Sequence, residues 1–327
     1  MRRFALLFLL VLPTTLVALE PSTTRPVSTY SIVARDAATG EMGVAVQSHW
    51  FSVGSLVTWA RAGVGAVATQ SLVDPTYGPL GLELMQAGRS APDALAGLLE
   101  ADSSPQIRQV AMVDANGQVA AHTGAGCIAA AGHVTGEGFT VQANLMDKDT
   151  VPRAMADAFT AAQGTLAARM IHALAAAEAE GGDIRGRQSA AILVVKGESS
   201  GRPWEDIVVE LRVEDHPHPV QELHRLYVLH TGYASMNDGD LALEVGDTAG
   251  AEKHYGAAME ILGDNLEARF WAAVALVNSG DVERALPHFL HIFQRGDNWK
   301  RLVPRLVDAG LLNADEVVLQ RILGEGE

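Results

Sequence analysis

The fold is decided by residues 29–48, which read TYSIVARDAATGEMGVAVQS. Two short apolar runs, at 30–34 and 42–46, are separated by DAATG at 36–40, where aspartate and glycine favour a turn. Short strand-like runs around a glycine-containing turn predict a β-hairpin.

Beyond the hairpin, strand and helix patterns follow one another in blocks. Strands are predicted at 56–60, 65–69, 109–113, 118–122, 139–143, 190–195 and 207–213, and helices at 79–87, 91–100 and within 152–180. Blocks of strands without strict βα alternation favour helices stacked on antiparallel sheets. We predict an α+β domain, a four-layer αββα sandwich. A single antiparallel sheet with helices on one face is the alternative.

The region after about residue 220 is helical and contains a repeat. Gly246-Asp247 recurs 34 positions later as Gly280-Asp281. Small and aromatic residues recur at the same offset, pairing Ala251 with Ala285, Tyr255 with Phe289, and Met259 with Phe293. A period of 34 residues is typical of tetratricopeptide repeats, in which each helix pair covers the apolar face of the next. We predict a second, all-α domain at 223–327.

The N-terminus predicts export. Arg2 and Arg3 precede a short apolar run at 4–12, and a cleavage site is expected near Ala18. The run is shorter than the roughly 20 residues that span a membrane, so we expect no membrane span. We assign residues 1–18 to a signal peptide, 19–28 to a leader and 29–222 to the α/β domain. The protein is then periplasmic or secreted.

Composition narrows the choice of partners. The chain has 327 residues, 48% of them hydrophobic, and a formal net charge of −15. No cluster of lysine and arginine offers a phosphate-binding surface, so a nucleic-acid partner is not expected. The one cysteine, Cys127, excludes an intrachain disulfide and a thiolate zinc site, and we interpret it as a small buried hydrophobe.

Several segments resemble the domain-of-unknown-function 1028 family over about residues 29–225. They are 29–36, 40–48, 65–70, 108–109, 123–124 with Cys127 and 131–133, 181–190 and 215–217. The resemblance implies an Ntn-hydrolase-like fold. In such hydrolases the first residue of the opening strand is the nucleophile, which here would be Thr29, and its own α-amine is the base.

The chemistry of Thr29 depends on its nitrogen. A threonine hydroxyl needs an adjacent base, and an N-terminal amine titrates close enough to neutrality to serve. Signal cleavage after Ala18 leaves ten residues before Thr29, whose nitrogen is then an amide. Activity requires a second cut between Ser28 and Thr29, for which autoproteolysis by the Thr29 hydroxyl is a reasonable route. Otherwise Thr29 is an ordinary β-branched strand residue.

Other polar residues complete the candidate catalytic site. Ser31 lies on the same strand face as Thr29 and is the backup nucleophile. Ser48 and His49 end the second strand of the hairpin, near the start of the first. Asn144 follows the strand at 139–143, where its side-chain amide could donate to an oxyanion. The sequence has no lysine between residues 29 and 147, so a lysine beside the nucleophile is missing.

A second polar group precedes the strand at 190–195. Asp183, Arg185 and Gln188 could bind a substrate carboxylate, or could tie a helix end to the sheet. His216 and His218 are two metal-type ligands without a third, and the prolines beside them favour a rigid linker. We therefore expect neither a metal nor another cofactor.

Two functions remain open. The first is an exported N-terminal-nucleophile amidohydrolase that acts on a small peptide or acyl-amide substrate, with the helical tail recruiting a protein partner or ordering homo-oligomers. The second is a non-catalytic envelope scaffold, in which an inactive Ntn fold and the helical repeats bind protein or peptide. The retained leader and the missing lysine favour the scaffold, whereas the strand opening and the polar group favour the enzyme.

Overall fold

The computed structural model describes residues 27–324. The predicted signal peptide and leader residues 19–26 lie outside the described residues. The elements of the α/β domain are, in chain order, β1 (Thr29–Arg35), β2 (Met42–Ser48), α1 (Gly54–Val57), β3 (Thr58–Arg61), β4 (Gly65–Ser71), α2 (Tyr77–Gln86), α3 (Ala91–Ala101), β5 (Arg108–Asp114), β6 (Val119–Thr123), β7 (Gly132–Gly136), β8 (Phe139–Ala143), α4 (Val151–Ala161), α5 (Leu166–Glu180), β9 (Ser189–Val195) and β10 (Ile207–Val213).

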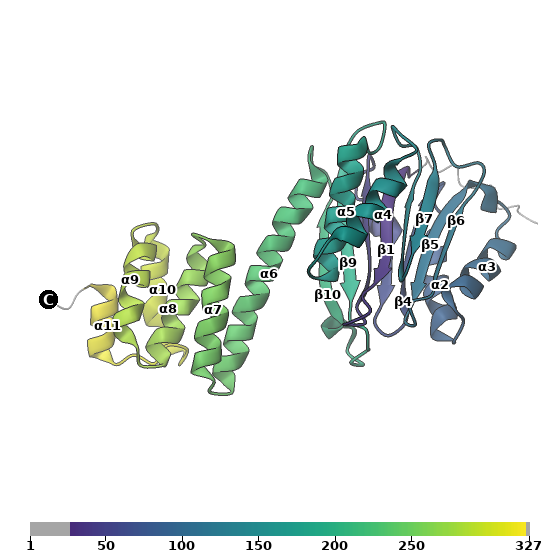
Figure 1. Cartoon of the computed structure of the whole chain (residues 1–327). Helices are drawn as coiled ribbons and strands as arrows, with labels where there is room; N and C mark the ends of the chain where they lie inside the picture. Colours follow the sequence, from purple (N-terminus) through teal and green to yellow (C-terminus); the bar gives the residue numbers. More distant parts are fainter. Residues whose placement is uncertain (1–26, 325–327) are drawn as a thin grey trace, which may run out of the picture.

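These elements form four layers. Within the described residues the strands make two antiparallel sheets, one ordered β10-β9-β2-β1-β8-β7 and the other β3-β4-β5-β6. The sheets pack against each other, with α4 and α5 on the first and α2 and α3 on the second, as Figure 1 shows edge-on. The predicted αββα sandwich is confirmed. The single-sheet alternative is wrong, because β3 to β6 pair among themselves and form a sheet of their own.

The opening hairpin forms as predicted and lies at the centre of the larger sheet. Thr29 pairs with Ser48 at its open end, and Arg35 pairs with Met42 next to the turn. In the turn, the Asp36 carboxylate accepts hydrogen bonds from two backbone N–H groups, and Gly40 has a φ of +75°. A side chain that bonds its own backbone and a glycine with positive φ are what this turn requires.

Alternation along β1 separates two cores. Ile32 and Ala34 belong to the core beneath α4 and α5, whereas Val33 belongs to the core between the two sheets. Successive residues of a strand point to opposite faces, so Thr29 and Ser31 share the side of Val33. The candidate nucleophile and its backup therefore point into the space between the sheets.

The strand predicted at 56–60 is partly wrong. The chain first forms the short helix α1, in which the Val57 N–H bonds the Val53 carbonyl, and β3 begins only at Thr58. Periodicity alone does not separate a short buried strand from a helical turn in a brief apolar run. The other predicted strands and helices of the domain are present, and Ser90 caps α3 by accepting from the Asp93 N–H.

The C-terminal helices are α6 (Pro219–Glu244), α7 (Thr248–Leu262), α8 (Leu266–Asn278), α9 (Val282–Phe293), α10 (Asp297–Asp308) and α11 (Glu316–Leu323). The two predicted repeat units have equivalent local structure. Asp247 caps α7 and Asp281 caps α9, each by accepting from a backbone N–H three residues on. The buried small and aromatic positions are Ala251 and Tyr255 in α7, and Ala285 and Phe289 in α9.

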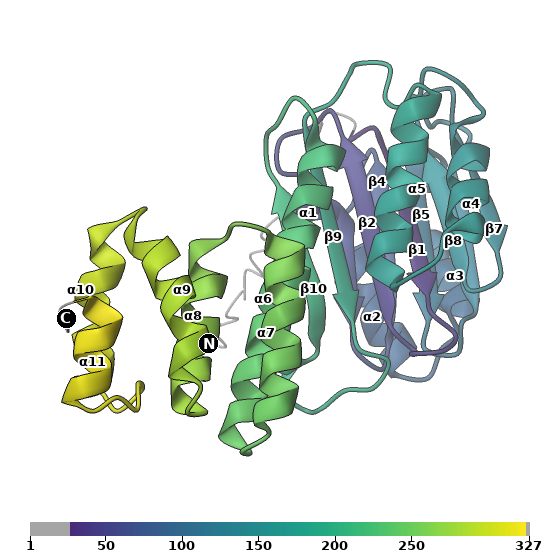
Figure 2. The same cartoon turned by 60° about the vertical axis from the view of Figure 1, so that its left-hand side comes forward.

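Helix α6 joins the two parts of the molecule. Its first turns bury Val220 and Leu223 in the core under α5, and farther along Met236 packs in the core of the tail. The boundary predicted between residues 222 and 223 falls inside this continuous helix. Figure 2 shows α6 lying beside β10 at one end and beside α7 at the other.

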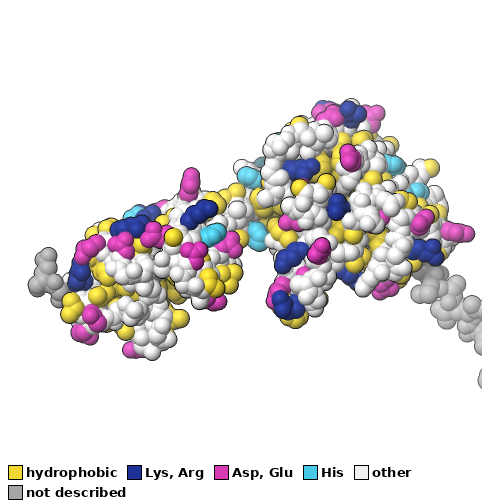
Figure 3. All heavy atoms as spheres, turned by 60° about the horizontal axis from the view of Figure 1, so that its bottom comes forward, with side chains coloured by type: hydrophobic (Ala, Val, Ile, Leu, Met, Phe, Trp, Pro, Cys, Tyr) yellow, Lys and Arg dark blue, Asp and Glu magenta, His cyan; other side chains and the backbone are white. Residues whose placement is uncertain are grey.

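The surface carries both signs of charge. On the face drawn in Figure 3, acidic and basic side chains are interspersed over both parts of the molecule, and neither sign forms a continuous patch. Between residues 27 and 324, no helix has the length and hydrophobicity that a membrane span requires.

Candidate functional site

A layer of polar side chains fills one end of the space between the two sheets. At the other end the same space is lined by valine and alanine side chains of β1, β2, β4 and β5. The polar end lies where β1 begins. The side chains of this polar layer are fully buried and are Thr29, Ser31, Ser48, Gln70, Gln109, Gln142 and Asn144.

Three predicted residues converge on the peptide bond before Thr29. The carbonyl oxygen of Ser28 accepts a hydrogen bond of 2.5 Å from Ser48 Oγ and one of 2.9 Å from Arg185 Nη2. The Thr29 hydroxyl donates to the carbonyl of Val27 at 2.8 Å, so it is turned back over the Ser28–Thr29 bond. The bond that the hydrolase hypothesis requires to be cut is thus the one whose carbonyl is held by two donors.

Arg185 is positioned by Asp183, whose side chain is 0% exposed. The guanidinium binds both carboxylate oxygens, through Nε at 3.0 Å and Nη2 at 2.7 Å. The backbone N–H groups of Arg185 and His49 also donate to this carboxylate. A two-pronged pair of this kind fixes the guanidinium in one orientation. The pair therefore aims Arg185 at the Ser28 carbonyl and also anchors the end of β2.

The leader residues before Thr29 are bound as an extra piece of strand. The Val27 N–H donates to the Ser71 carbonyl at 2.7 Å, and the Ser71 N–H donates back to the Val27 carbonyl at 3.0 Å. Val27 and Ser28 are both fully buried. Ser71 has a φ of 71°, which is uncommon for a residue other than glycine and is often found at functional sites.

A network of amide side chains surrounds Ser31, next to the candidate nucleophile Thr29. Ser31 donates to Gln70 Oε1 at 2.6 Å and accepts from Gln142 Nε2 at 2.5 Å. Gln109 Oε1 accepts from Gln70 Nε2 at 2.7 Å and from Asn144 Nδ2 at 2.8 Å. Because the Ser31 hydroxyl is held by these hydrogen bonds with Gln70 and Gln142, it is not directed at a peptide carbonyl.

Asn144 and Gln70 also hold Thr29 through its main chain. The Thr29 carbonyl accepts from the Asn144 backbone N–H at 3.1 Å and from Gln70 Nε2 at 3.2 Å. The Asn144 side chain points to Gln109, while its Oδ1 has no hydrogen-bond partner among the described residues. Asn144 lies in the polar layer but does not bind the Ser28 carbonyl.

Two predicted side chains lie outside both this layer and the Asp183–Arg185 pair. The His49 side chain is exposed, and only its backbone N–H reaches Asp183. The Gln188 amide donates to Asp215 at 3.2 Å, away from Arg185. Conversely, sequence reasoning missed Gln70 and Gln109, although both occupy strand positions at which alternation calls for an apolar residue facing the other sheet.

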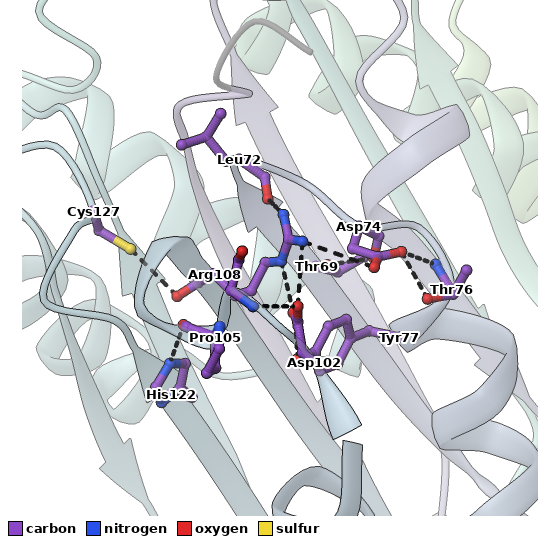
Figure 4. A network of polar contacts seen from close by, with 11 residues as sticks. Thr69, Leu72, Asp74, Thr76, Tyr77, Asp102, Pro105, Arg108, His122 and Cys127 are labelled. Carbon is purple, nitrogen blue, oxygen red and sulfur yellow. Dashed lines mark hydrogen bonds and ion pairs between the residues drawn. The ribbon is translucent and has the colours of Figure 1, made fainter. Parts of the chain in front are cut away.

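A second polar cluster, drawn in Figure 4, holds the main chain at Leu72, the residue after Ser71. Arg108 donates to the Asp102 carboxylate at 2.8 Å and to the carbonyl of Leu72 at 2.5 Å. Tyr77 also donates to Asp102, and burial together with this bond raises the pKa of the Tyr77 phenol. The cluster borders a hollow of about 610 Å³. Its charges are paired with one another, so it fixes the chain just after Ser71.

The cysteine and the two histidines considered in the sequence analysis make hydrogen bonds within the fold. The Cys127 thiol donates to the carbonyl of Arg108 at 3.3 Å, and burial raises the pKa of this thiol. His216 Nδ1 accepts from the His218 N–H where α6 begins. Between residues 27 and 324, no group of three or more histidine, cysteine, aspartate or glutamate side chains is placed to hold a metal ion.

Comparisons with known proteins agree with the two-part organisation. A sequence model described as a family of unknown function, DUF1028, matches residues 29–223, and a tetratricopeptide-repeat model matches residues 242–302. A crystal structure of the DUF1028 protein SPO2555 from Silicibacter pomeroyi is similar, with a TM-score of 0.55 and 32% identity. The similarity covers 61% of this chain and 84% of that one. A search of curated proteins gives no match.

These findings confirm the family resemblance and the repeat that the sequence predicts. The assignment to the wider Ntn-hydrolase-like superfamily stays a prediction, as do the roles of the site residues.

Proposed function

We propose, from the premise that this chain belongs to the DUF1028 family of unknown function, that its α/β domain is an amide-bond hydrolase that makes its own nucleophile by cutting the Ser28–Thr29 bond. One observation carries the proposal. The Ser28 carbonyl oxygen accepts from Ser48 and Arg185 while the Thr29 hydroxyl is turned back over the same bond.

The self-cutting step needs only groups that are present and one water. The Thr29 oxygen attacks the Ser28 carbonyl carbon, the C–N bond to Thr29 breaks, and the hydroxyl proton ends on the Thr29 nitrogen. Water then hydrolyses the resulting ester, which leaves a carboxylic acid on Ser28 and a free amine and hydroxyl on Thr29. Ser48 and Arg185 donate to the oxygen on which negative charge develops, as the donors of an oxyanion hole do.

Turnover would use the same atoms in a second role. The freed Thr29 amine takes the hydroxyl proton, and the oxygen attacks the carbonyl of a peptide or acyl-amide substrate. The substrate amine leaves with that proton, and water hydrolyses the acyl ester. Arg185 is the cation beside this site, and its charge is paired with the buried Asp183 carboxylate.

A second function is favoured by the tail. Tetratricopeptide repeats generally bind other proteins along their stacked helices. The described tail has a hollow of about 130 Å³ between α7, α8 and α9, lined by Tyr255, Arg284 and His288 among others. We infer that the tail recruits a protein partner or another copy of the chain. If Thr29 keeps its leader, an envelope scaffold is the remaining function.

The location belongs to the same proposal. Export to the periplasm or the medium rests on residues 1–18, which read as a signal peptide. Under this proposal the chain is cut twice. The signal peptide is removed first, and the cut between Ser28 and Thr29 follows, which leaves a chain that starts at Thr29.

Intact mass of the purified full-length chain tests the enzyme proposal. We expect a species that begins at Thr29 in the wild type and in Thr29→Ser, and only the uncut chain in Thr29→Ala. Ser31→Ala is expected to be cut, because its hydroxyl is already held by Gln70 and Gln142. Equal cutting of Thr29→Ala and the wild type would refute the proposal, since it would assign the cut to another group.

A further inference from the structure

We propose that the acyl half of the substrate is an extended peptide that ends in a small residue, alanine or serine, and that it takes the place held by Val27 and Ser28 in the uncut chain. The inference rests on the proposed function, because the leader occupies the acyl side of the first bond that Thr29 cuts. What the structure adds is the chemistry that recognises this acyl half.

Main-chain pairing indicates a peptide and not a simple acyl group. Val27 exchanges two hydrogen bonds with the main chain of Ser71, of 2.7 and 3.0 Å. Only a ligand with an amide N–H and a carbonyl on the same residue satisfies both groups of Ser71. Addition of an extended peptide to an available strand end is a common mode of peptide recognition.

The strand end that receives this residue is held independently of the leader. Arg108, anchored on Asp102, donates to the carbonyl of Leu72, the residue after Ser71 (Figure 4). Ser71 itself is already in its left-handed conformation, with a φ of 71°. The pairing edge is therefore expected to keep its shape after the leader departs, and to receive a second peptide without rearrangement.

The two side chains of the leader define the size of the residues that fit. Val27 is fully buried and belongs to the apolar core between the sheets, so an aliphatic residue is favoured there. Ser28 is also fully buried, and its hydroxyl has no hydrogen-bond partner among the described residues. Alanine fills the same space without burying an unpaired hydroxyl, so it should be accepted at least as well as serine.

The product should bind at the same place. Once the bond is cut, the residue in the Ser28 position carries a carboxylate, which meets the Ser48 hydroxyl and the Arg185 guanidinium. Charge-assisted hydrogen bonds to a guanidinium are stronger than neutral ones. A peptide with a free terminal carboxylate should therefore bind more tightly than its amide.

Fluorogenic peptides test the inference on full-length protein that has cut itself, with Thr29 as the new N-terminus verified by mass. The probe is acetyl-Arg-Pro-Val-Ser-aminomethylcoumarin, which copies the leader, together with versions that carry alanine or leucine in place of serine. We expect kcat/KM for alanine to equal or exceed that for serine, and leucine to lose roughly 10- to 100-fold because the space is filled. N-methylation of the valine should cost about tenfold, since it removes the donor to Ser71.

A binding arm uses the same preparation without turnover. Calorimetry should show acetyl-Arg-Pro-Val-Ala with a free carboxylate binding more tightly than its amide, and N-methylation of its valine should weaken that binding as well. Self-cut protein that prefers leucine, or that ignores N-methylation in both arms, would overturn the inference and leave the proposed function standing. Protein that never exposes Thr29 would overturn both.

Discussion

Ser48→Ala tests the proposed oxyanion hole most directly. Ser48 is the last residue of β2, and its Oγ lies 2.5 Å from the carbonyl oxygen of Ser28. The substitution removes this donor and no other described hydrogen bond of that side chain. Arg185 Nη2 stays at 2.9 Å from the same oxygen, so the carbonyl keeps one of its two donors.

The expected loss is large in rate and small in stability. Removal of one oxyanion donor typically slows reaction about 10²- to 10³-fold, which corresponds to about 2.7–4 kcal/mol of transition-state stabilisation. Loss of one buried hydrogen bond costs the folded state only about 0.5–1.5 kcal/mol. The variant should therefore stay folded and accumulate as the uncut chain, while the wild type proceeds to the chain that begins at Thr29.

The assay is a time course of intact mass on purified full-length protein, and the sheet supplies a matched control. Ser189 pairs directly with Ser48 across β9 and β2 and is equally buried. Its hydroxyl donates to the Trp50 carbonyl and accepts from the Val53 N–H, and it has no bond to Ser28. Ser189→Ala should lose at least as much stability as Ser48→Ala and yet be cut at the wild-type rate.

Two outcomes would refute the reasoning. If Ser48→Ala is cut as fast as the wild type, the hydroxyl does not stabilise developing charge and the oxyanion hole must be placed elsewhere. If both serine variants slow equally, the loss reflects general weakening of the sheet, and the contact with Ser28 carries no special role.

Two further predictions concern stability. Burial raises the pKa of Asp102, but hydrogen bonds from Arg108 and its surroundings outweigh it, so the folded-state pKa is lowered. The stabilisation that goes with this lowered pKa is fully present above the unfolded pKa of about 4, and it is lost as the pH falls through the lowered folded value. In urea unfolding, Asp102→Asn should therefore cost about 1–3 kcal/mol at pH 7 and less in acid. A cost that stays the same at every pH would contradict this. In the tail, Gly232→Ala should destabilise by about 1–3 kcal/mol, because its new Cβ would lie 2.3 Å from Leu262 Cγ, whereas Gly256→Ala in open space should stabilise by about 0.5–1 kcal/mol. Equal thermal shifts for the two glycine variants would count against the packing described for α6 and α7.

The framework could be predicted from the sequence because its signals are local. The hairpin at 29–48 has both strands and its turn within a few residues of one another. The repeat that contains Asp247 and Asp281 can be recognised from its period of 34 residues. The helical turn at 54–57 was not predicted, because its shape depends on hydrogen bonds with distant segments. One of these is the bond that the Val53 N–H donates to Ser189 Oγ. Local pattern does not carry that information.

The site could be predicted in part only. Thr29 and Ser48 are neighbours through the hairpin, so their proximity follows from local pairing. Arg185 lies 157 residues from Ser28, and its contact with that carbonyl depends on how the loop after α5 folds back over the sheet. Gln70 and Gln109 do have a recognisable sequence signal, because they are amides at strand positions where an apolar residue is expected.

The placement of the polar layer is the strongest physical reason to prefer an enzyme over a scaffold. Buried amide and hydroxyl groups cost free energy unless they are paired by hydrogen bonds. Apolar side chains like those at the valine-lined end would hold the two sheets together without this cost. Here the amides are concentrated at the end where β1 starts, and one of them, Gln70, donates to the main-chain carbonyl of Thr29 itself. Gln142 and Asn144 each keep a buried oxygen without a hydrogen-bond partner among the described residues. A binding scaffold that works through its helical tail gains nothing from such a layer, whereas a nucleophile that must be held in one position does.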